Sequence, residues 1–162
     1  KSLHDYNYID ERRECVIKLL GGFKLTRSRT AQPCLMLEYM QWNLSMFAAY
    51  YENNVIPLDI LKYITREILR GLEYIHFCGV VHADVKPENV LISACNPKNC
   101  HECPDRKTNC SKLHVKIADF GNCIRTSGNG IVLMQTRPYR SLESILGYDC
   151  ESPVDIWSLA CE

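Results

Sequence analysis

The sequence lacks a net charge, a long apolar segment and an amino-terminal leader pattern. Its 19 lysine and arginine residues balance 19 aspartate and glutamate residues, so the overall charge gives no reason to expect binding to nucleic acid or to an anionic membrane. No apolar run approaches the roughly 18 residues that a membrane-spanning helix needs, and the first ten residues lack the apolar middle of a signal peptide. We therefore expect an intracellular protein that binds neither membranes nor nucleic acid directly.

Apolar residues are spaced in patterns that predict strands first and mainly helices afterwards. The clearest pattern begins after Pro57, where Ile60, Ile64, Ile68 and Leu72 recur at helical spacing. A polar stretch predicts a turn at residues 26–33, and the sequence around residue 153 resembles a helix start with a capping box formed by Ser152 and Asp155. Residues 15–25 predict two short strands or one bent strand, interrupted at Gly21 and Gly22. The other predicted strands are 34–40, 80–81, 90–92 and 115–117, and the predicted helices are 44–51, 57–77 and one that begins near 153.

Four side chains that suit phosphoryl transfer follow two of the predicted strands. Asp84, Lys86 and Asn89 come after the strand at 80–81, and Asp119 ends the strand at 115–117. The transition state of phosphoryl transfer spreads negative charge over the transferred group, so a protein must supply cations and position the attacking hydroxyl. In such a site Asp84 accepts or orients the hydroxyl, and Lys86 contacts the phosphate. The oxygens of Asn89 and Asp119 suit Mg²⁺, which is a hard cation.

At these positions the sequence resembles the eukaryotic protein kinases. Residues 82–89, which read His-Ala-Asp-Val-Lys-Pro-Glu-Asn, match the catalytic loop, and residues 119–121, Asp-Phe-Gly, match the metal-binding motif. The resemblance extends over nearly the whole chain and implies an α+β, two-lobed protein kinase fold. It implies that residues 1–162 form a partial kinase domain, with the end of the small β lobe and the hinge at 1–40 and part of the mainly helical large lobe at 41–162.

The same resemblance implies a nucleotide site beside these residues. Residues 35–40 look like the strand that leads into the adenine-binding hinge, with Leu37 as the gatekeeper. By that resemblance, backbone groups of Glu38 and Met40 bond the adenine, and Leu91 lies under its ring. ATP and Mg²⁺ are therefore the expected cofactors.

The residues after position 134 suggest which kinases the chain resembles most. Residues 135–143 look like the substrate-facing loop of the CMGC group, in which an arginine, here Arg137, follows the threonine. The pair of Lys86 and Thr136 resembles the Ser/Thr kinases rather than the tyrosine kinases. Arg140 precedes Ser-Leu-Glu instead of the usual Ala-Pro-Glu, which points to the SR-protein kinases. That resemblance implies a kinase of the cytoplasm or nucleus that phosphorylates serine in Arg-Ser-rich splicing factors.

Two other functions remain open. The chain is also similar to other CMGC kinases, of the dual-specificity tyrosine-regulated or CDC-like type, although their usual Ala-Pro-Glu is absent here. A pseudokinase that serves as a binding scaffold belongs to a different class. Such a scaffold has no need of the Mg²⁺ ligands, so the presence of Asn89 and Asp119 argues against it.

Several kinase features are missing from the sequence. It contains no Gly-rich loop for the phosphates, no strand lysine and no helix glutamate of the kinase pattern, and its one Gly-x-Gly, at residues 128–130, predicts a turn. We therefore expect the chain to be the middle of a longer enzyme and, by itself, marginally stable and inactive. Ala83 stands where kinases usually carry an arginine that pairs with a phosphorylated loop, so we expect activity without loop phosphorylation.

The ten cysteines divide into two sets. Cys95, Cys100, Cys103 and Cys110 lie in a polar insertion at residues 93–114 and are spaced C-x4-C-x2-C-x6-C. One pair has the spacing of zinc ligands, but the other intervals are irregular. A structural zinc site and a surface loop of reduced thiols both remain open, and we favour the loop. The other six are scattered and predict reduced thiols in the core or on the surface.

Overall fold

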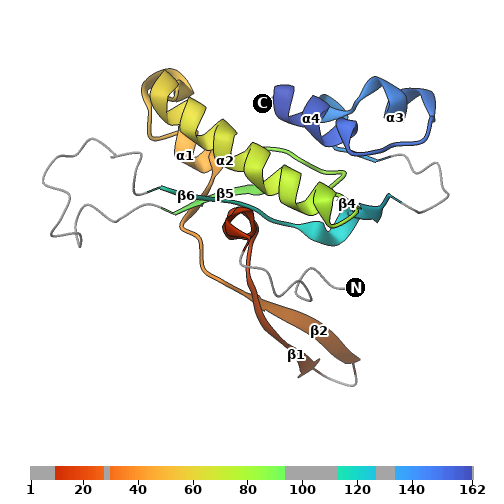
Figure 1. Cartoon of the computed structure of the whole chain (residues 1–162). Helices are drawn as coiled ribbons and strands as arrows, with labels where there is room; N and C mark the ends of the chain where they lie inside the picture. Colours follow the sequence, from red (N-terminus) through yellow and green to blue (C-terminus); the bar gives the residue numbers. More distant parts are fainter. Residues whose placement is uncertain (1–9, 28–29, 94–112, 127–133, 162) are drawn as a thin grey trace, which may run out of the picture.

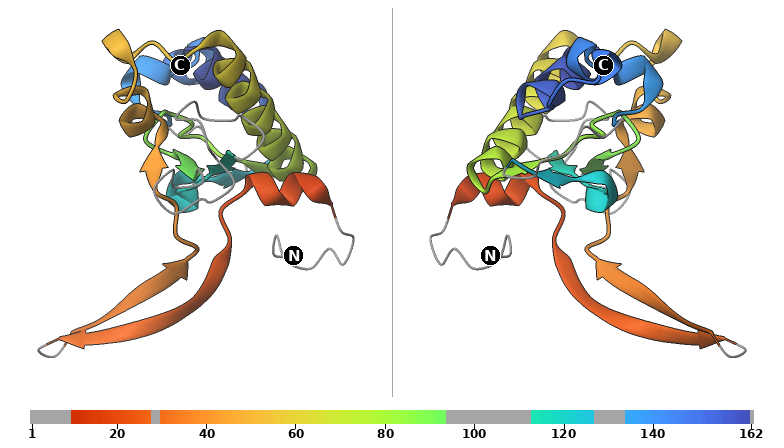
Figure 2. Two further views of the ribbon diagram at one scale, coloured as in Figure 1. Left: turned by 90° about the vertical axis from the view of Figure 1, so that its left-hand side faces the viewer. Right: turned by 90° about the vertical axis from the view of Figure 1, so that its right-hand side faces the viewer.

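The computed structural model describes residues 10–27, 30–93, 113–126 and 134–161. Figure 1 shows a body of helices and short strands, from which one long hairpin extends. The two side views of Figure 2 show the same hairpin standing away from the body. The described chain thus combines helices with antiparallel strands, as the sequence predicts.

The hairpin consists of β1 (Leu19–Arg27) and β2 (Thr30–Leu37), which pair antiparallel with a register shift between Leu19 and Gly21. Of the two alternatives for this segment, one bent strand is confirmed and two short strands are wrong, because Gly21 and Gly22 both keep a partner on β2 next to the register shift. Glycine is common at such a shift, where the backbone of a strand bends.

Most of the apolar side chains of this hairpin are exposed. The turn predicted at residues 26–33 is wrong for residues 26–27 and 30–33, because these residues pair within the two strands. A two-stranded hairpin without cover is marginally stable in water. This exposure supports the prediction that the chain alone is marginally stable. The exposed fractions range from 41% to 71% for Leu19, Leu20, Phe23, Leu25, Leu35, Met36 and Leu37.

The body is built around the long helix α2 (Leu58–Phe77), which follows Pro57 as predicted. Its apolar face is buried against a three-stranded sheet in the order β3-β5-β6. The helix ends at Cys78, and Gly79 then adopts a φ of +73°, which favours glycine. The buried residues of α2 are Ile60, Ile64, Ile68, Gly71, Leu72, Tyr74 and Ile75.

Short elements complete the body. The strands of the central sheet are β3 (Trp42–Asn43), β5 (Val90–Ser93) and β6 (His114–Ile117). A second small sheet pairs β4 (Val80–Val81) with β7 (Ile124–Arg125). The remaining helices are α1 (Leu44–Ala48), α3 (Leu142–Leu146) and α4 (Pro153–Ala160), with 3-10 helices η1 (Glu11–Cys15), η2 (Glu52–Asn54), η4 (Phe120–Asn122) and η5 (Arg137–Tyr139). Within the described residues, no helix has both the length and the apolar composition required to cross a membrane.

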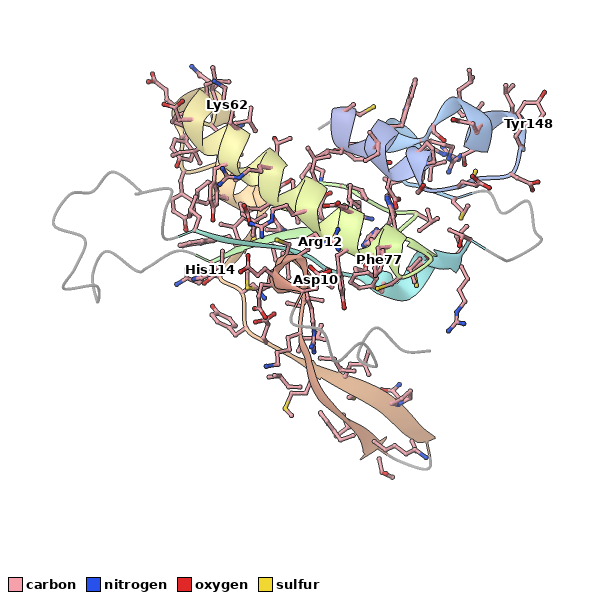
Figure 3. The ribbon with its side chains drawn as sticks, viewed as in Figure 1. Asp10, Arg12, Lys62, Phe77, His114 and Tyr148 are labelled. Carbon is pink, nitrogen blue, oxygen red and sulfur yellow. The ribbon has the colours of Figure 1, made fainter. Side chains whose placement is uncertain are left out.

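The segment η1 crosses α2 at close range. Cys15, which the sequence placed in a strand, is instead the buried last residue of η1. Arg12 of η1 forms ion pairs with Asp10 at 2.7 Å and with Glu73 of α2 at 2.9 Å, and its guanidinium lies 5.7 Å from the centre of the Phe77 ring. Figure 3 shows Asp10 and Arg12 beside the end of α2 that carries Phe77. These contacts hold the start of the described chain against the central helix.

The capping box predicted at the start of α4 is wrong. Ser152 has helical backbone angles, and within the described residues its side chain makes no capping hydrogen bond. The reason lies in Asp155, whose fully buried carboxylate accepts hydrogen bonds from another part of the chain. A side chain used there does not reach back to the start of its own helix.

Replacement of Gly71 by alanine tests the close crossing of η1 and α2. A Cβ atom at this position would lie 2.9 Å from the Cys15 carbonyl oxygen and 2.9 Å from Ile117 Cδ1. We expect Gly71→Ala to lower the free energy of unfolding by about 1–3 kcal/mol through overpacking, although alanine favours helix. Urea unfolding of the full-length protein measures this. The exposed Lys62→Ala serves as the control, and equal or higher stability of Gly71→Ala contradicts the described crossing.

Candidate active site

Residues 82–89, named the catalytic loop after the kinase motif that they match, connect β4 to β5. The Asp155 side chain binds the start of this loop. The two carboxylate oxygens of Asp155 accept the backbone N–H groups of His82 and Ala83, both at 2.8 Å. His76 Nε2, at the end of α2, lies 2.8 Å from the same carboxylate and donates to it, because an ionised carboxylate only accepts. These three donors satisfy a charge that would otherwise be costly to bury.

The first residues of the loop are fixed by further contacts. Ala83 has a φ of +64°, a conformation that alanine disfavours and that its hydrogen bond to Asp155 helps to hold. The ring of His82 accepts the Asp84 N–H at Nδ1 (3.2 Å), so its Nε2 carries the hydrogen and donates to the Ala118 carbonyl at 2.9 Å. His82 therefore links Asp84 to the residue that precedes Asp119.

The Asp84 carboxylate is buried and lies at the centre of a polar cluster. Lys86 Nζ lies 2.8 Å from its Oδ2, and Thr136 Oγ1 lies 2.6 Å from its Oδ1. Lys86 Nζ also lies 3.1 Å from Thr136 Oγ1. The structure therefore brings together three residues that the sequence predicted for this site, from two segments about fifty residues apart.

The pKa values of this cluster keep both charges in place. Burial acts to raise the pKa of the Asp84 carboxyl, but hydrogen bonds from Lys86 and Thr136 outweigh it and leave the pKa below its ordinary value. The pKa of Lys86 is raised, chiefly by its hydrogen bond to Asp84. At neutral pH the site therefore holds a carboxylate beside an ammonium group.

Asn89 and Asp119 lie at neighbouring strand ends. The Asn89 carbonyl accepts the N–H of Ala118 at 2.9 Å, and Asn89 Nδ2 donates to the Asp84 carbonyl at 2.9 Å. Asp119 follows β6 with a φ of +66°, and its carboxylate accepts the N–H of Gly121 at 3.3 Å. Asn89 and Asp119 thus bring two side chains with oxygen atoms to the same end of the β5–β6 pair.

The side-chain oxygens of Asn89 and Asp119 suit a magnesium ion that is bound together with a nucleotide. Within the described residues, no group of three or more His, Cys, Asp or Glu side chains forms a ready metal site. Mg²⁺ commonly uses one or two protein oxygens and completes its shell with phosphate oxygens and water. Asn89 and Asp119 would hold the ion in this way.

Lys116 of β6 links Glu38 of the predicted hinge to the sheet that carries Leu91. Leu91 is opposite Lys116 in the register of β5 and β6, so both side chains leave the same face of the sheet. Lys116 Nζ reaches Glu38 at 3.0 Å, and the same Glu38 oxygen accepts the Lys18 N–H at 2.7 Å. The Glu38 N–H donates to the Lys18 carbonyl at 3.0 Å. Leu91 thus shares a face with the lysine that binds the hinge; contacts of Glu38, Met40 and Leu91 with adenine remain a prediction.

The substrate loop, residues 135–143, packs against α4 through a glutamine that the sequence analysis missed. Gln135 Nε2 donates to the Val154 carbonyl at 2.9 Å and to Ser158 Oγ at 2.8 Å, and its Oε1 accepts the Ser141 N–H at 2.9 Å. Its own N–H donates to the Ala83 carbonyl at 3.0 Å. A single glutamine therefore connects the substrate loop to α4 and to the catalytic loop.

The two arginines of the substrate loop differ in direction. Arg137 begins η5 and is exposed. Arg140 turns inward, where its guanidinium donates to the carbonyls of Met134 and Gln135, both at 2.9 Å. Arg137 is thus available at the surface, whereas Arg140 supports the loop backbone.

The predicted zinc ligands lie outside the described residues. Cys95, Cys100, Cys103 and Cys110 all fall within residues 94–112. The six cysteines that the structure describes carry free thiols. Among these, Cys161 is exposed although it lies in an apolar run, and burial raises the pKa of the Cys15 thiol to about 11.

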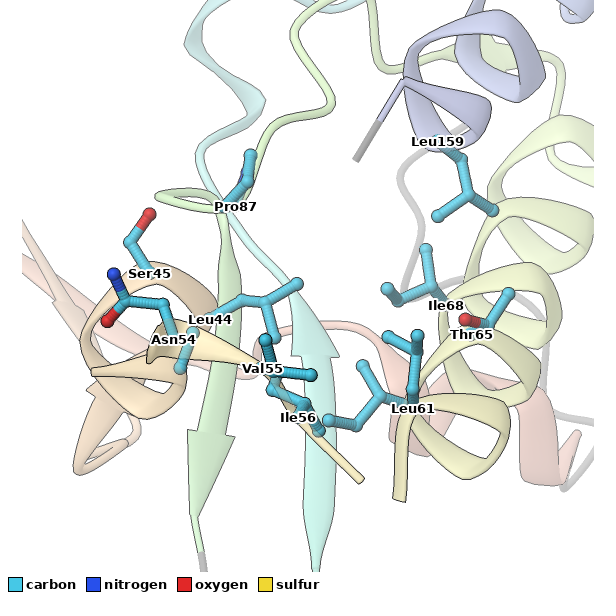
Figure 4. A pocket seen from close by; sticks show the side chains of 12 residues that line it. Leu44, Ser45, Asn54, Val55, Ile56, Leu61, Thr65, Ile68, Pro87 and Leu159 are labelled. Atoms are coloured by element: carbon cyan, nitrogen blue, oxygen red, sulfur yellow. The ribbon is translucent and has the colours of Figure 1, made fainter. Parts of the chain in front are cut away.

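An apolar cavity of about 440 Å³ lies behind the catalytic loop (Figure 4). It is bordered by α1, by the segment before α2 and by α2 itself, with Leu159 of α4 at one side. Among the described residues that line it, only Pro87 belongs to the catalytic loop. The cavity is therefore distinct from the polar cluster around Asp84.

The fold and the polar cluster around Asp84 belong to a known class. The protein kinase domain family matches residues 10–162, so the chain belongs to the protein kinase family. The predicted α+β kinase fold is confirmed, and the relatives below make it a CMGC-type domain.

Relatives of this chain include several named kinases. It is 31% identical to the serine/threonine-protein kinase SRPK of Physarum polycephalum, over 93% of this chain and 45% of that protein. It is 30% identical to the dual specificity protein kinase YAK1 homolog of Arabidopsis thaliana, over 79% of this chain and 12% of that protein. It is 29% identical to the serine/threonine-protein kinase Kist of Rattus norvegicus, over 89% of this chain and 33% of that protein. The chain spans less than half the length of each.

Replacement of Asp155 by asparagine tests the support of the catalytic loop. Asparagine keeps one oxygen but turns an NH₂ group towards N–H groups that need an acceptor. We expect Asp155→Asn to lower the free energy of unfolding by about 1–3 kcal/mol. Chemical unfolding of the full-length protein measures the change, with the exposed Glu151→Gln as the control. Equal stability of both variants contradicts the role of Asp155 described above.

Proposed function

We propose that the full-length protein is a Ser/Thr kinase that transfers the γ-phosphate of ATP to a protein hydroxyl. The observation that carries this proposal is the placement of Asp84 between Lys86 and Thr136. A carboxylate kept ionised beside an ammonium group suits an in-line transfer, which requires a positioned hydroxyl and compensation of phosphate charge.

In this mechanism the substrate hydroxyl oxygen attacks the γ-phosphorus while the bond from phosphorus to the ADP oxygen breaks. The hydroxyl proton passes to Asp84, whose carboxylate orients the hydroxyl before the attack. Lys86 moves its charge towards the transferred phosphate, as its flexible stem allows. When Mg²⁺ is bound, it neutralises charge on the phosphates, and Asn89 and Asp119 would be its protein ligands. Glu38, Met40 and Leu91 are the proposed adenine contacts.

For the substrate we propose serine in Arg-Ser-rich protein segments, such as those of splicing factors. The Ser-Leu-Glu sequence after Arg140 and the similarity to the SRPK kinase of Physarum support this choice. Similarity to the YAK1 homolog at nearly the same identity supports a second candidate, a dual-specificity kinase of the CMGC group. A location in the cytoplasm or nucleus belongs to the same proposal.

Phosphate transfer by the full-length protein tests the function. With ATP, Mg²⁺ and either an Arg-Ser repeat peptide or a Ser-Pro peptide, we expect faster labelling of the Arg-Ser peptide. Asp84→Asn should lower the rate by ~10²–10⁴ while nucleotide binding, measured by calorimetry, is retained. The exposed Asp59→Asn is the matched control.

The outcomes separate the candidates. Preference for the Ser-Pro peptide would overturn the proposed substrate class but keep the kinase function. Nucleotide binding without transfer to either peptide, or transfer that survives in Asp84→Asn, would contradict the proposed mechanism. The first of these two results would favour a pseudokinase scaffold.

Activity without loop phosphorylation is a separate expectation. Ala83 is buried in an apolar cluster with Val81, Met134 and Val154, where an arginine side chain would require a partner for its charge. The contacts of Gln135 tie the substrate loop to α4 without any phosphate group. We expect treatment with a protein phosphatase to leave the transfer rate of the full-length protein unchanged. A complete loss of activity after this treatment would contradict the expectation.

A further inference from the structure

The Asp84 carboxylate also accepts a hydrogen bond from Asn122, a residue for which no sequence motif indicated a role. Asn122 Nδ2 lies 3.3 Å from Asp84 Oδ2. Because an ionised carboxylate can only accept, the Asn122 atom that faces it is the NH₂ group. Asn122 belongs to η4, a 3-10 helix that begins directly after Asp119. The other side-chain donors to this carboxylate come from the catalytic loop and the substrate loop.

The backbone on both sides of Asn122 is held in place. Before it, the Asp119 carboxylate accepts the Gly121 N–H at 3.3 Å. After it, β7 pairs with β4, and Ile124 lies opposite Val81, the residue that precedes the catalytic loop. The pairing of β7 with β4 therefore holds Asn122 beside the catalytic loop.

Donors on the two oxygens of Asp84 fix the rotation of its carboxylate. Thr136 donates to Oδ1, whereas Lys86 and Asn122 donate to Oδ2. Asn89 lies farther from Oδ2, at 3.4 Å, and makes its shorter hydrogen bond to the Asp84 carbonyl. In the proposed mechanism Lys86 must follow the phosphate. A donor that stays in place while Lys86 moves would keep the carboxylate aligned with the hydroxyl.

We infer that Asn122 is a positioning residue for phosphoryl transfer, which fixes the Asp84 carboxylate through its amide and ties it to the turn that carries Asp119. This inference rests on the proposed kinase function. Asn122 acts through Asp84 and is assigned no contact with the substrate. Its loss should therefore slow the transfer step and leave nucleotide binding unchanged.

Single-turnover kinetics of the full-length protein tests the inference, with rapid-quench measurement of phosphate transfer to the peptide that the wild type labels. We expect Asn122→Ala to lower the transfer rate about tenfold, as for the loss of one hydrogen bond to a charged group. The KM for ATP should stay within about twofold. Asn122→Asp keeps the shape but places a carboxylate against Asp84, so its rate should fall further. Asn122→Gln, which retains the amide, should recover part of the rate.

The control is Cys123→Ala, a change of the exposed neighbouring residue, which should transfer phosphate at the wild-type rate. Thermal unfolding of each variant establishes that it is folded, and a rate is compared only between folded variants. If Asn122→Ala does not fold, the order of the Asp and Gln variants decides the question.

Two results would overturn the inference while leaving the proposed function intact. One is an Asn122→Asp variant as fast as the wild type, which would mean that only the shape of residue 122 matters. The other is an Asn122→Ala variant that transfers phosphate at the wild-type rate. If that variant does not fold, an Asn122→Gln variant that is no faster than Asn122→Asp has the same meaning. If the wild type transfers no phosphate to either peptide, the proposed function fails, and the inference fails with it.

Discussion

The buried carboxylate of Asp155 holds the catalytic loop in a backbone conformation that the loop does not favour by itself. Its oxygens accept the N–H groups of His82 and Ala83 and the ring N–H of His76. A fully buried carboxylate is unfavourable unless donors surround it, so the carboxylate and the loop each supply what the other lacks. The positive φ of Ala83 then directs the chain so that Asp84 meets its partners.

Those partners come from three different segments of the chain. The catalytic loop supplies Lys86, the substrate loop supplies Thr136, and η4 supplies Asn122. Each segment is tied to the rest by hydrogen bonds: β4 pairs with β7, and Gln135 binds Ala83 through its backbone N–H and α4 through its side chain. The position of the Asp84 carboxylate therefore depends on how these segments pack together as well as on its direct partners.

The sequence predicted the elements whose signal is local. The helix now called α2 has the regular apolar spacing that a helix packed on one face requires, and the strands before and after the catalytic loop are short apolar runs. Asp84 and Lys86 were predicted to share a site from their residue types and spacing, whereas Thr136 was indicated only through the kinase resemblance. Spacing alone does not show that residue 136 returns to residue 84.

The missed residues have roles that are set by distant contacts. Asp155 matched a capping box, because its sequence position suits the first turn of α4 as well as a bond to a distant loop. Gln135 and Asn122 are polar residues whose individual roles no sequence pattern indicates. Gln135 binds Val154, 19 positions away, and Asn122 binds Asp84, 38 positions away. Their roles depend on the tertiary arrangement. The choice at Gly21 and Gly22 between two short strands and one bent strand stayed open for the same reason, since only the pairing with β2 decides it.

The strand that leads to Asp119 also binds Glu38, in the segment proposed as the hinge. The Lys116 side chain is only 8% exposed, and its ammonium lies between Glu38 at 3.0 Å and Glu14 at 3.7 Å. A buried ammonium needs such carboxylates, because an unpaired charge at this depth would strongly destabilise the fold. Glu38 also accepts the Lys18 N–H, just before the hairpin. The start of the hairpin, the proposed hinge and β6 therefore meet at the Glu38 carboxylate. Two residues after the end of β6, Asp119 begins the turn that reaches Asp84 through Asn122. The proposed adenine site and the cluster around Asp84 are therefore connected through a single short strand.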